Sequence, residues 1–508
     1  MNLAHFLDMA AARYPEKRAV ICEGNTITYD ALKRRADELS ASLPRRGVTR
    51  GTPVAILSSN SIEYVEILFA LMKAGAVAVP LNPRLTQREI KILIEHSEAK
   101  VLFCEKAFQE LVPEKAGTLE QVIGIGGKHP PAAVEYEELF HSGSCADGIP
   151  LVSENDPAAI IYTAGTTDEP KGVLLTHDNL IWNTLNYSAA LGYGPQDIEL
   201  APTPLFHAST FGRIFTYVFN AMTAIMVRKF SPADCLSVIE QEQVTSITQA
   251  PTMYQMMLDV WSDGKWDTRS VKRAVTGAAP MSAEAKISLK NLFPRAGFFD
   301  LYGLTEASPG VAILTPADFY RKPESVGRPM LSVEVRAAGA DDLKLPPGEV
   351  GEILCRGPSI MLEYYKAPQA TARALHGGWL HTGDAGWIDE EGYVYLAGRI
   401  KDIIISGGVN IYPGEVEAVL MQHPAVKEAA VIGMQDALWG EKVVAVIVLH
   451  TNASCSAQVL LDFCRERLAA FKCPRSVAFL PELPRNAAQK VMKQELKRTL
   501  QDLNETLP

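Results

Sequence analysis

The chain has 508 residues, too long for a single hydrophobic core, so we expect two or more domains. Hydrophobic residues make up 47% of the chain and charged residues 21%, as in ordinary soluble globular proteins. The net charge of -10 argues against nucleic acid or an anionic membrane as the main partner. The eight cysteines include no C-x-x-C pair, so the sequence indicates neither a zinc site nor a redox motif, and we expect a cytoplasmic protein with reduced cysteines.

The sequence predicts neither a cleaved leader nor a membrane span. Residues 1–17 carry Asp8 and lack a basic start, so they predict a short amphipathic helix. The most apolar stretch, 211–227, is interrupted by Arg213 and Asn220. We therefore expect it to form a buried helix and a strand rather than a membrane span.

Helix and strand patterns alternate from residue 26 onward. Amphipathic helices are predicted at 31–43, 61–75 and 87–99, and short apolar strands at 53–58, 76–81 and 100–104. Short apolar strands between helices indicate parallel sheets covered by helices. Residues 105–154 are less regular and rich in Gly, Pro and Glu, so we expect them to include surface loops. The alternation resumes at Pro157 and continues past residue 300.

The pattern changes at about 330–397. Short strands at 333–338, 351–357 and 393–398 are separated by turns, which predicts a small all-β subdomain. A compact segment follows, with predicted helices at 415–424 and 456–471 and strands at 426–434 and 441–450. We therefore predict an α/β protein with a large N-terminal domain at 1–400 and a small α+β C-terminal domain at 401–508.

The strongest local pattern is AAIIYTAGTTDEPKGVLL at 158–175, an apolar strand, a polar loop and a second apolar stretch. Threonine hydroxyls and glycine backbone N–H groups can cradle phosphate oxygens, and Lys171 adds a positive charge. The spacing does not fit G-x-x-x-x-G-K-[ST], so this is not an ordinary P-loop. On composition alone, a polar hairpin loop is an equally good interpretation.

This stretch resembles the motif Y-T-S-G-T-T-G-x-P-K-G of the adenylate-forming superfamily, which includes acyl-CoA synthetases, luciferases and nonribosomal-peptide adenylation domains. Ala164 replaces the usual Ser and loses a hydroxyl donor, and Asp168 replaces the usual Gly and adds a carboxylate near the expected phosphates. Both departures bear on the affinity for ATP. The resemblance implies that the phosphates of ATP contact Thr163, Gly165, Thr166, Thr167 and Lys171.

The segment FFDLYGLTEAS at 298–308 resembles the family motif Y-G-x-T-E. The resemblance implies that Tyr302 stacks on adenine, that Asp300 accepts a hydrogen bond from its amino group and that Thr305 contacts the α-phosphate. Glu306 would be a ligand of Mg²⁺, which prefers carboxylate and phosphate oxygens. Without the loop at 163–171, a Thr-Glu pair would simply indicate a helix N-terminus.

Two further segments resemble parts of the family's substrate site. AVTGAAPMS at 274–282 resembles the turn that lies against adenine, at Gly277, Ala278 and Ala279, where small side chains permit close approach of a flat ring. TPLFHAS at 203–209 places His207 where the family has a histidine or an aromatic residue beside the acyl pocket and the thiol entry. Taken alone, the segment 274–282 would indicate a strand-end turn, and His207 would indicate a structural histidine.

The segment GWLHTGDAGWIDEEGYVYLAGRIKD at 378–402 resembles a further family block. It implies that Asp384 accepts hydrogen bonds from both ribose hydroxyls and that Arg399 reaches the ribose or a phosphate. Lys401 matches the hinge about which the small domain is thought to swing. Gly407 and Gly408 would let the pantetheine arm of coenzyme A pass close to the backbone.

Two C-terminal segments complete the resemblance. GMQDALWGEKV at 433–443 resembles the block that lies near the nucleotide of coenzyme A in acyl-CoA ligases. LPRNAAQKVMKQELKR at 483–498 places the family's catalytic lysine at Lys490, whose ammonium would bridge the substrate carboxylate and the α-phosphate. Gln489 stands where a glycine usually precedes this lysine.

The function that the resemblance implies is an AMP-forming acyl-CoA ligase with ATP, Mg²⁺ and coenzyme A as cofactors and cosubstrates. The small residues Gly277, Ala278, Ala279 and Gly303 indicate an unblocked acyl pocket, and the stretch 206–227 indicates apolar walls, so we expect a fatty or aryl acid. Open alternatives are an enzyme that loads a carrier-protein thiol, a luciferase-like oxygenase, and a nucleotide-binding homologue without catalysis. A homodimer would be ordinary for the family.

Overall fold

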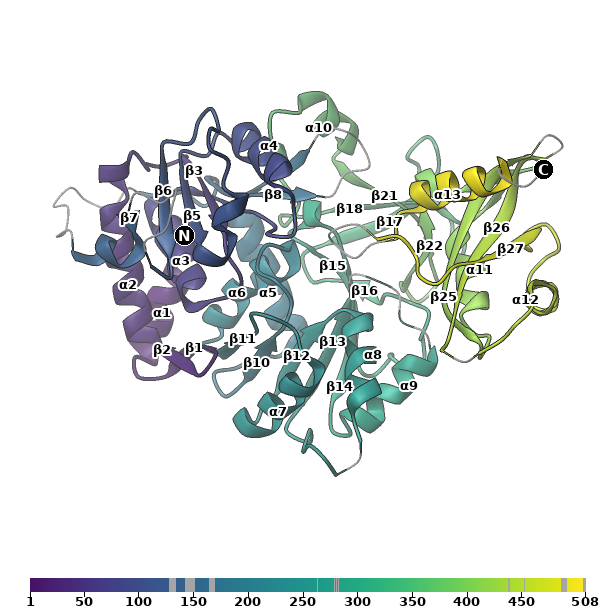
Figure 1. The fold of residues 1–508 in the computed structure, drawn as a ribbon, viewed down its shortest axis with the longest axis horizontal. Coiled ribbons are helices and arrows are strands. Elements are labelled where there is room, and N and C mark those ends of the chain that lie inside the picture. The colour runs from purple at the N-terminus through teal and green to yellow at the C-terminus, as the bar shows by residue number, and fades with distance from the viewer. Residues whose placement is uncertain are drawn as a thin grey trace. The chain divides into compact units, whose positions relative to one another are not determined.

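The structure is a computed structural model, and it describes residues 1–127, 134–141, 151–163, 170–262, 264–277, 279, 281, 283–436, 439–451, 453–485 and 491–505. The chain divides into two compact units (Figure 1). The first comprises Met1–Val335 and Cys355–Leu380, and the second comprises Arg336–Leu354 and His381–Pro508. The functional division at residue 401, with a hinge near Lys401, stays a prediction.

The first unit contains two large sheets (Figure 1). In the described residues, one sheet has nine strands in the order β16 (Arg328–Pro329), β15 (Gly310–Leu314), β14 (Gly297–Gly303), β13 (Arg273–Gly277), β12 (Ser246–Gln249), β10 (Ile198–Ala201), β11 (Thr223–Met226), β1 (Arg18–Cys22) and β2 (Asn25–Thr28). The other has eight strands in the order β19 (Glu363–Tyr364), β9 (Lys171–Thr176), β8 (Pro157–Thr163), β4 (Val77–Pro80), β3 (Pro53–Leu57), β5 (Val101–Glu105), β6 (Gln121–Ile125) and β7 (Val134–Glu135).

The predicted parallel pairing is present in the middle of both sheets. Strands β10 to β14 pair in parallel in one sheet, and β3 pairs in parallel with β4 and β5 in the other. Antiparallel strands are added at the edges, where β15 follows β14 and β9 follows β8 through short connections. Both antiparallel pairs carry segments of the predicted nucleotide site.

Helices cover these sheets. They are α1 (Ala4–Arg13), α2 (Tyr29–Ser42), α3 (Ile62–Ala74), α4 (Gln87–Ser97), α5 (His177–Leu191), α6 (Ala208–Phe219), α7 (Pro232–Glu242), α8 (Pro251–Val260), α9 (Ala283–Leu292) and α10 (Pro368–Ala374). Helix α5 begins at a capping box of Thr176 and Asn179 and ends at Gly192, whose φ of 59° is left-handed. It contacts β9 of one sheet and β15 of the other, so it lies between them (Figure 1).

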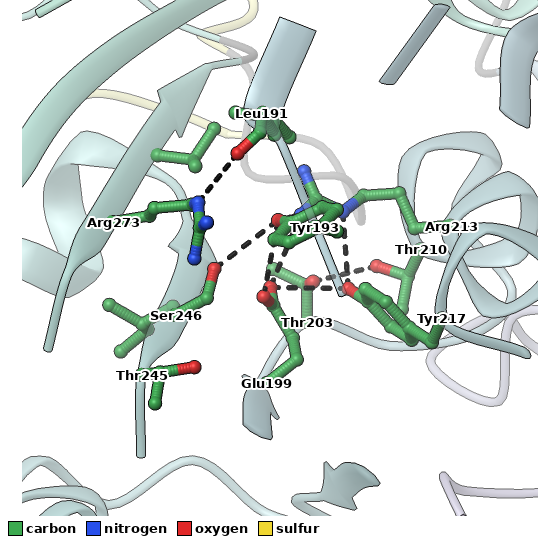
Figure 2. A network of polar contacts seen from close by, with 12 residues as sticks. Leu191, Tyr193, Glu199, Thr203, Thr210, Arg213, Tyr217, Thr245, Ser246 and Arg273 are labelled. Carbon is green, nitrogen blue, oxygen red and sulfur yellow. Dashed lines mark hydrogen bonds and ion pairs between the residues drawn. The ribbon is translucent and has the colours of Figure 1, made fainter. Parts of the chain in front are cut away.

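A buried polar network fixes α6 against the nine-stranded sheet (Figure 2). Arg213 donates from Nη2 to the hydroxyl of Tyr193 at 2.7 Å and to Oε1 of Glu199 at 3.2 Å, and from Nε to the hydroxyl of Tyr217 at 3.1 Å. Both hydroxyls in turn donate to Glu199. These hydrogen bonds offset the cost of burying the charges. Since His207 is the N-cap residue of α6, the network holds the helix that begins at this predicted site residue.

The predicted small β subdomain is a five-stranded sheet. Its strands are β17 (Glu334–Ala338), β18 (Gly351–Arg356), β21 (Trp379–Ile388) and β20 (Leu375–His376) in that order, and β22 (Val394–Arg399) pairs with β21. The pairing of β21 with β22 sets Asp384 opposite Arg399. Two predicted site residues are thereby brought together by strand register.

The second unit also contains a sheet that is covered on both faces. In the described residues its strands are β24 (Val409–Ile411), β23 (Ile404–Ser406), β26 (Gly440–Leu449) and β25 (Val426–Asp436), with β27 (Ser476–Phe479) paired to β26. Helices α11 (Pro413–Leu420) and α12 (Ala457–Arg465) pack on one face, and α13 (Lys493–Glu505) packs on the other. Burial on both faces explains why the sequence at 441–450 is almost continuously apolar.

Most helices and strands predicted from the sequence are confirmed within a few residues of their predicted ends. The stretch 211–227 forms most of α6 and all of β11, as predicted. The region 105–154 holds more than loops, because it adds β6, β7 and the short 3-10 helices Lys106–Leu111 and Tyr136–His141. Among the described helices, none combines the length and the apolar character that crossing a membrane would require.

Candidate active site

The predicted phosphate loop is framed by an antiparallel hairpin. Thr163 ends β8, Lys171 begins β9, and the two residues are cross-strand partners, both half-buried. The strands form because AAIIY and VLL bury their apolar side chains in the core of the eight-stranded sheet. The loop residues Gly165, Thr166 and Thr167, and the departures Ala164 and Asp168, lie outside the described residues.

Lys171, Tyr364 and Glu306 form one cluster beside this hairpin. Strand β19 pairs with β9, which sets Tyr364 opposite Val173. The ring centroid of Tyr364 lies 5.4 Å from Nζ of Lys171, and its hydroxyl donates to Oε1 of Glu306 at 2.7 Å. The cluster therefore joins the base of the phosphate loop to the predicted metal ligand through one aromatic side chain.

Thr305 and Glu306 lie on the 3-10 helix η4 (Thr305–Ala307), directly after β14, and both are half-buried. The backbone N–H of Met361 donates to the carbonyl of Glu306 at 2.8 Å, which fixes its main chain. A carboxylate with one oxygen held by a hydroxyl and one left as a hard ligand suits Mg²⁺, which is usually bound by one or two carboxylates together with phosphate oxygens. The donor set at Glu306 thus fits this ion.

The predicted adenine residues lie at the carboxyl end of β14. Asp300 and Tyr302 both belong to this strand and are buried. The carboxylate of Asp300 forms an ion pair with Lys286 of α9, Oδ2 to Nζ 3.0 Å. Parallel α/β sheets bind ligands at the carboxyl ends of their strands, so this position suits a nucleotide base.

The neighbouring turn after β13 is only partly described. Gly277 ends β13 opposite Leu301, and Ala279 is exposed, whereas Ala278 lies outside the described residues. A Cβ on Gly277 would meet the carbonyl oxygen of Leu301 at 2.9 Å, and one on Gly303 would meet that of Pro309 at 1.7 Å. Close backbone approach therefore accounts for both glycines, so they do not support the expectation of an unblocked acyl pocket.

His207 precedes the first turn of α6 as its N-cap residue and is half-buried. Its ring lies against that of Phe206, with centroids 4.4 Å apart. Its carbonyl accepts hydrogen bonds from the backbone N–H groups of Thr210 and Phe211. These contacts fix the backbone of His207, and a role beside an acyl group stays a prediction.

The second unit holds the predicted ribose residues. Nε of Arg399 lies 3.0 Å from Oδ1 of Asp384, and Nη1 of Arg399 donates to the carbonyl of Thr382 at 2.9 Å. Asp384 is buried and Arg399 is half-buried. Lys401 is exposed on the short 3-10 helix Ile400–Asp402. The arginine thus orients the carboxylate that the resemblance assigns to the ribose hydroxyls.

The predicted pantetheine glycines lie beside Trp439, also in the second unit. Gly407 and Gly408 adopt left-handed φ values of 59° and 79°, which glycine accepts at no cost. The N–H of Gly407 donates to the carbonyl of Trp439 at 2.8 Å, and a Cβ on Gly407 would meet the indole ring at 2.8 Å. The guanidinium of Arg475 stacks over this ring, 4.4 Å from its centroid. Lys490, the predicted catalytic lysine, lies outside the described residues.

Comparison with known proteins identifies the family of this chain. Residues 7–365 match the AMP-binding enzyme family, and residues 415–490 match the AMP-binding enzyme C-terminal domain. The chain belongs to this family. The expected kinship with the acyl-CoA synthetases of the adenylate-forming superfamily is thereby confirmed, together with the α/β fold class.

Several relatives match over nearly the whole chain. The chain is 38% identical to a feruloyl-CoA synthase of Amycolatopsis sp, over 95% of this chain and 96% of the relative. It is 35% identical to a fatty acid–[acyl-carrier-protein] ligase of Streptomyces coeruleorubidus, over 96% and 94% of the two chains. A solved structure of o-succinylbenzoate coenzyme A synthetase from Bacillus subtilis, in complex with ATP and magnesium ion, matches with a TM-score of 0.84 and 32% identity over 97% and 99% of the chains.

Sequence reasoning missed three residues of this AMP-binding enzyme. Tyr364 stands in MLEYYK, Lys286 in AEAKISLK and Arg475 in FKCPRS, and none of these segments shows which side chain turns inward or onto a ring. A lysine in a helix usually predicts a solvated side chain, yet Lys286 is buried. Their contacts become visible only when the sheets and helices are assembled.

Proposed function

We propose that the chain is an AMP-forming acyl-CoA ligase for a fatty or aryl acid. The observation that carries this proposal is the cluster of Lys171, Tyr364 and Glu306 at the base of the hairpin Thr163–Lys171. It offers a cation, an oriented carboxylate and the ends of a threonine-rich loop within one small region. A triphosphate with a divalent cation is the ligand that such groups would bind together.

In the first half-reaction, a carboxylate oxygen of the acid attacks the α-phosphorus of ATP. The bond to the β-phosphate oxygen breaks, so that an acyl-adenylate forms and pyrophosphate leaves. Lys171 and the hydroxyl of Thr305 stabilise the charge on the phosphate oxygens, and Glu306 would hold Mg²⁺. Mg²⁺, when bound, would neutralise phosphate charge at this site. The bridging ammonium assigned to Lys490 is part of the same proposal.

In the second half-reaction, the thiolate of coenzyme A attacks the acyl carbon and AMP leaves. The glycines at 407 and 408 and the exposed pair of Trp439 and Arg475 support coenzyme A as the thiol. An indole face stacks on a nucleotide base, and a guanidinium binds phosphate. Between the half-reactions, a rotation of the C-terminal domain about Lys401 would move Lys490 away from the active site and bring Gly408 toward it.

The carrier-protein alternative has one observation in its favour. A relative 35% identical to this chain is named as a fatty acid–[acyl-carrier-protein] ligase. The phosphopantetheine arm of a carrier protein lacks the adenine nucleotide of coenzyme A. A carrier-loading enzyme therefore has no use for the Trp439–Arg475 pair as a base platform, whereas a CoA ligase does.

The test is acid-dependent AMP release with coenzyme A across acetate, octanoate, palmitate, benzoate and cinnamate, on wild type and on Lys490→Ala. We expect turnover on one class of apolar acid and loss of most of the adenylation step in the variant. Acyl-adenylate formation without thioester formation on coenzyme A would support the carrier-loading alternative. The absence of ATP–pyrophosphate exchange with every acid would support the non-catalytic alternative.

A further inference from the structure

The buried ammonium of Lys286 is held by three groups of the first unit. Its side chain is 3% exposed, and that of its ion-pair partner Asp300 is 7% exposed. Nζ lies 3.0 Å from Oδ2 of Asp300, donates to the carbonyl of Pro323 at 2.5 Å and lies 4.9 Å from the ring centroid of Phe319. The carboxylate, the carbonyl oxygen and the aromatic face thus all attract the charge.

A buried lysine of this kind is costly unless it is paired. Lys286 lies in the first turns of α9, which follows the predicted adenine segment 274–282, and its ion pair with Asp300 links this helix to β14. The side chain of Lys286 therefore connects the covering helix α9 to Asp300 on strand β14. The other lysine of the same helix, Lys290, is exposed, so α9 does not need a buried cation to be amphipathic.

The ion pair with Lys286 opposes protonation of the buried Asp300 carboxyl. The strand neighbours of Asp300 are Thr276 on β13 and Leu314 on β15, both uncharged. Burial raises the pKa of the Asp300 carboxyl; Lys286 of α9, the charged side chain that faces it among the described residues, opposes this rise, as does a hydrogen bond with the backbone of Leu301. Without Lys286, the carboxyl group would be favoured in its neutral form.

The ionised and protonated forms of a carboxyl group form different hydrogen bonds with a purine base. An ionised carboxylate only accepts hydrogen bonds, whereas a protonated carboxyl group can also donate one. The amino group at position 6 of adenine donates, and the oxygen at position 6 of hypoxanthine accepts. An ionised Asp300 would therefore favour a 6-amino purine and leave a 6-oxo purine without a donor.

We propose that Lys286 is a positioning residue that keeps Asp300 a pure hydrogen-bond acceptor and thereby makes the nucleotide site select ATP over 6-oxo purine nucleotides. The inference rests on the proposed function, together with the contact between Asp300 and the amino group of adenine that the family resemblance implies. It extends that function by naming the residue that sets base selectivity. Lys286 does so through Asp300 and does not contact the nucleotide.

The experiment is equilibrium binding of ATP and of inosine triphosphate, both with Mg²⁺, to wild type and to Lys286→Met. A lost charge-assisted hydrogen bond corresponds to about tenfold in affinity, so we expect wild type to prefer ATP by about that factor. In Lys286→Met the ratio of the two dissociation constants should fall to about one or invert. The matched control is Lys290→Met, which removes an exposed lysine of the same helix and should keep the wild-type ratio.

A merely structural role for Lys286 would weaken both nucleotides equally and leave the ratio unchanged, and this result would overturn the inference while the proposed function stands. Wild type that binds neither nucleotide would overturn the proposed function and the inference with it. If Lys286→Met does not fold, the double variant Lys286→Met/Asp300→Asn decides, because it buries no charge. The amide that this double variant introduces at position 300 can both donate and accept a hydrogen bond. We therefore expect near-equal affinities for ATP and inosine triphosphate, and a retained preference for ATP would overturn the inference.

Discussion

The hydroxyl of Tyr364 donates a hydrogen bond of 2.7 Å to Oε1 of Glu306. This bond orients the carboxylate and directs its second oxygen away from the tyrosine. The same ring lies beside the ammonium of Lys171, 5.4 Å from its centroid. One side chain that touches no reacting atom thus positions both a phosphate-binding cation and the proposed metal ligand.

We therefore expect Tyr364→Phe to weaken Mg²⁺-dependent ATP binding and to slow adenylation by about tenfold, the effect of one hydrogen bond to a charged group. The phenylalanine ring keeps the contact with Lys171, so the loss reports on Glu306 alone. The measurements are ATP binding as a function of Mg²⁺ concentration and ATP–pyrophosphate exchange. In the control Tyr365→Phe, the hydroxyl that is lost donates to Glu98 at 3.4 Å and, in the part of the chain that the structure describes, does not contact Glu306, so both quantities should stay at the wild-type level. An Mg²⁺ dependence unchanged by Tyr364→Phe would contradict this positioning role.

Trp439→Ala should raise the KM for coenzyme A by about tenfold, because stacking of a base on an aromatic side chain contributes about 1–3 kcal/mol. The indole is 38% exposed and lies under the guanidinium of Arg475, so a base that stacks on this face would have to displace the arginine. Trp439→Phe, which retains an aromatic face, should retain most of the affinity. ATP–pyrophosphate exchange separates the two half-reactions, and its loss in Trp439→Ala would show that the indole acts elsewhere than at the thiol substrate.

The alternating pattern of the sequence predicted the fold well because each element buries a face of its own. The strand at 53–58 and the helix at 61–75 are examples, since β3 and α3 bury nearly every apolar side chain that the pattern contains. The short strands β6 and β7 were not predicted, because glycines and prolines interrupt the apolar residues around them. The antiparallel pairing of β15 with β14 was not predicted, because an apolar run does not reveal the direction of its partner.

The site was predicted less completely, because motif positions carry no information on pairing. The resemblance named Asp300 and Glu306, but their partners Lys286 and Tyr364 come from segments of 283–292 and 363–364 without a motif. From the sequence alone, the glycines at 277 and 303 predict an unblocked acyl pocket. Their neighbours are backbone carbonyls brought near by strand pairing, which spacing along the chain cannot show.

Arg213→Met should destabilise the first unit by about 3–5 kcal/mol, because it leaves the buried carboxylate of Glu199 without its ionic partner. Urea-induced unfolding measures this loss. The double variant Arg213→Met/Glu199→Leu removes both charges and should recover most of the stability, since an apolar pair avoids the cost of desolvation. A double variant as unstable as the sum of the two single variants would show that the ion pair is not coupled in the way that Figure 2 implies.

Because of the buried His177, we expect the folded chain to lose stability in mild acid. His177 is fully buried at the start of α5, accepts a hydrogen bond from the backbone N–H of Leu3, and burial lowers its pKa to about 4. The unfolded chain binds a proton near pH 6.5 and the folded chain only near pH 4, so stability is full above pH 6.5 and falls between these values. Between pH 7 and pH 5, wild type should lose about 2 kcal/mol more than His177→Gln, from a difference of about 1.4 kcal/mol per pH unit. Urea titrations at both pH values test this, with the exposed His450→Gln as the control that should behave as wild type, and equal losses in all three proteins would contradict it.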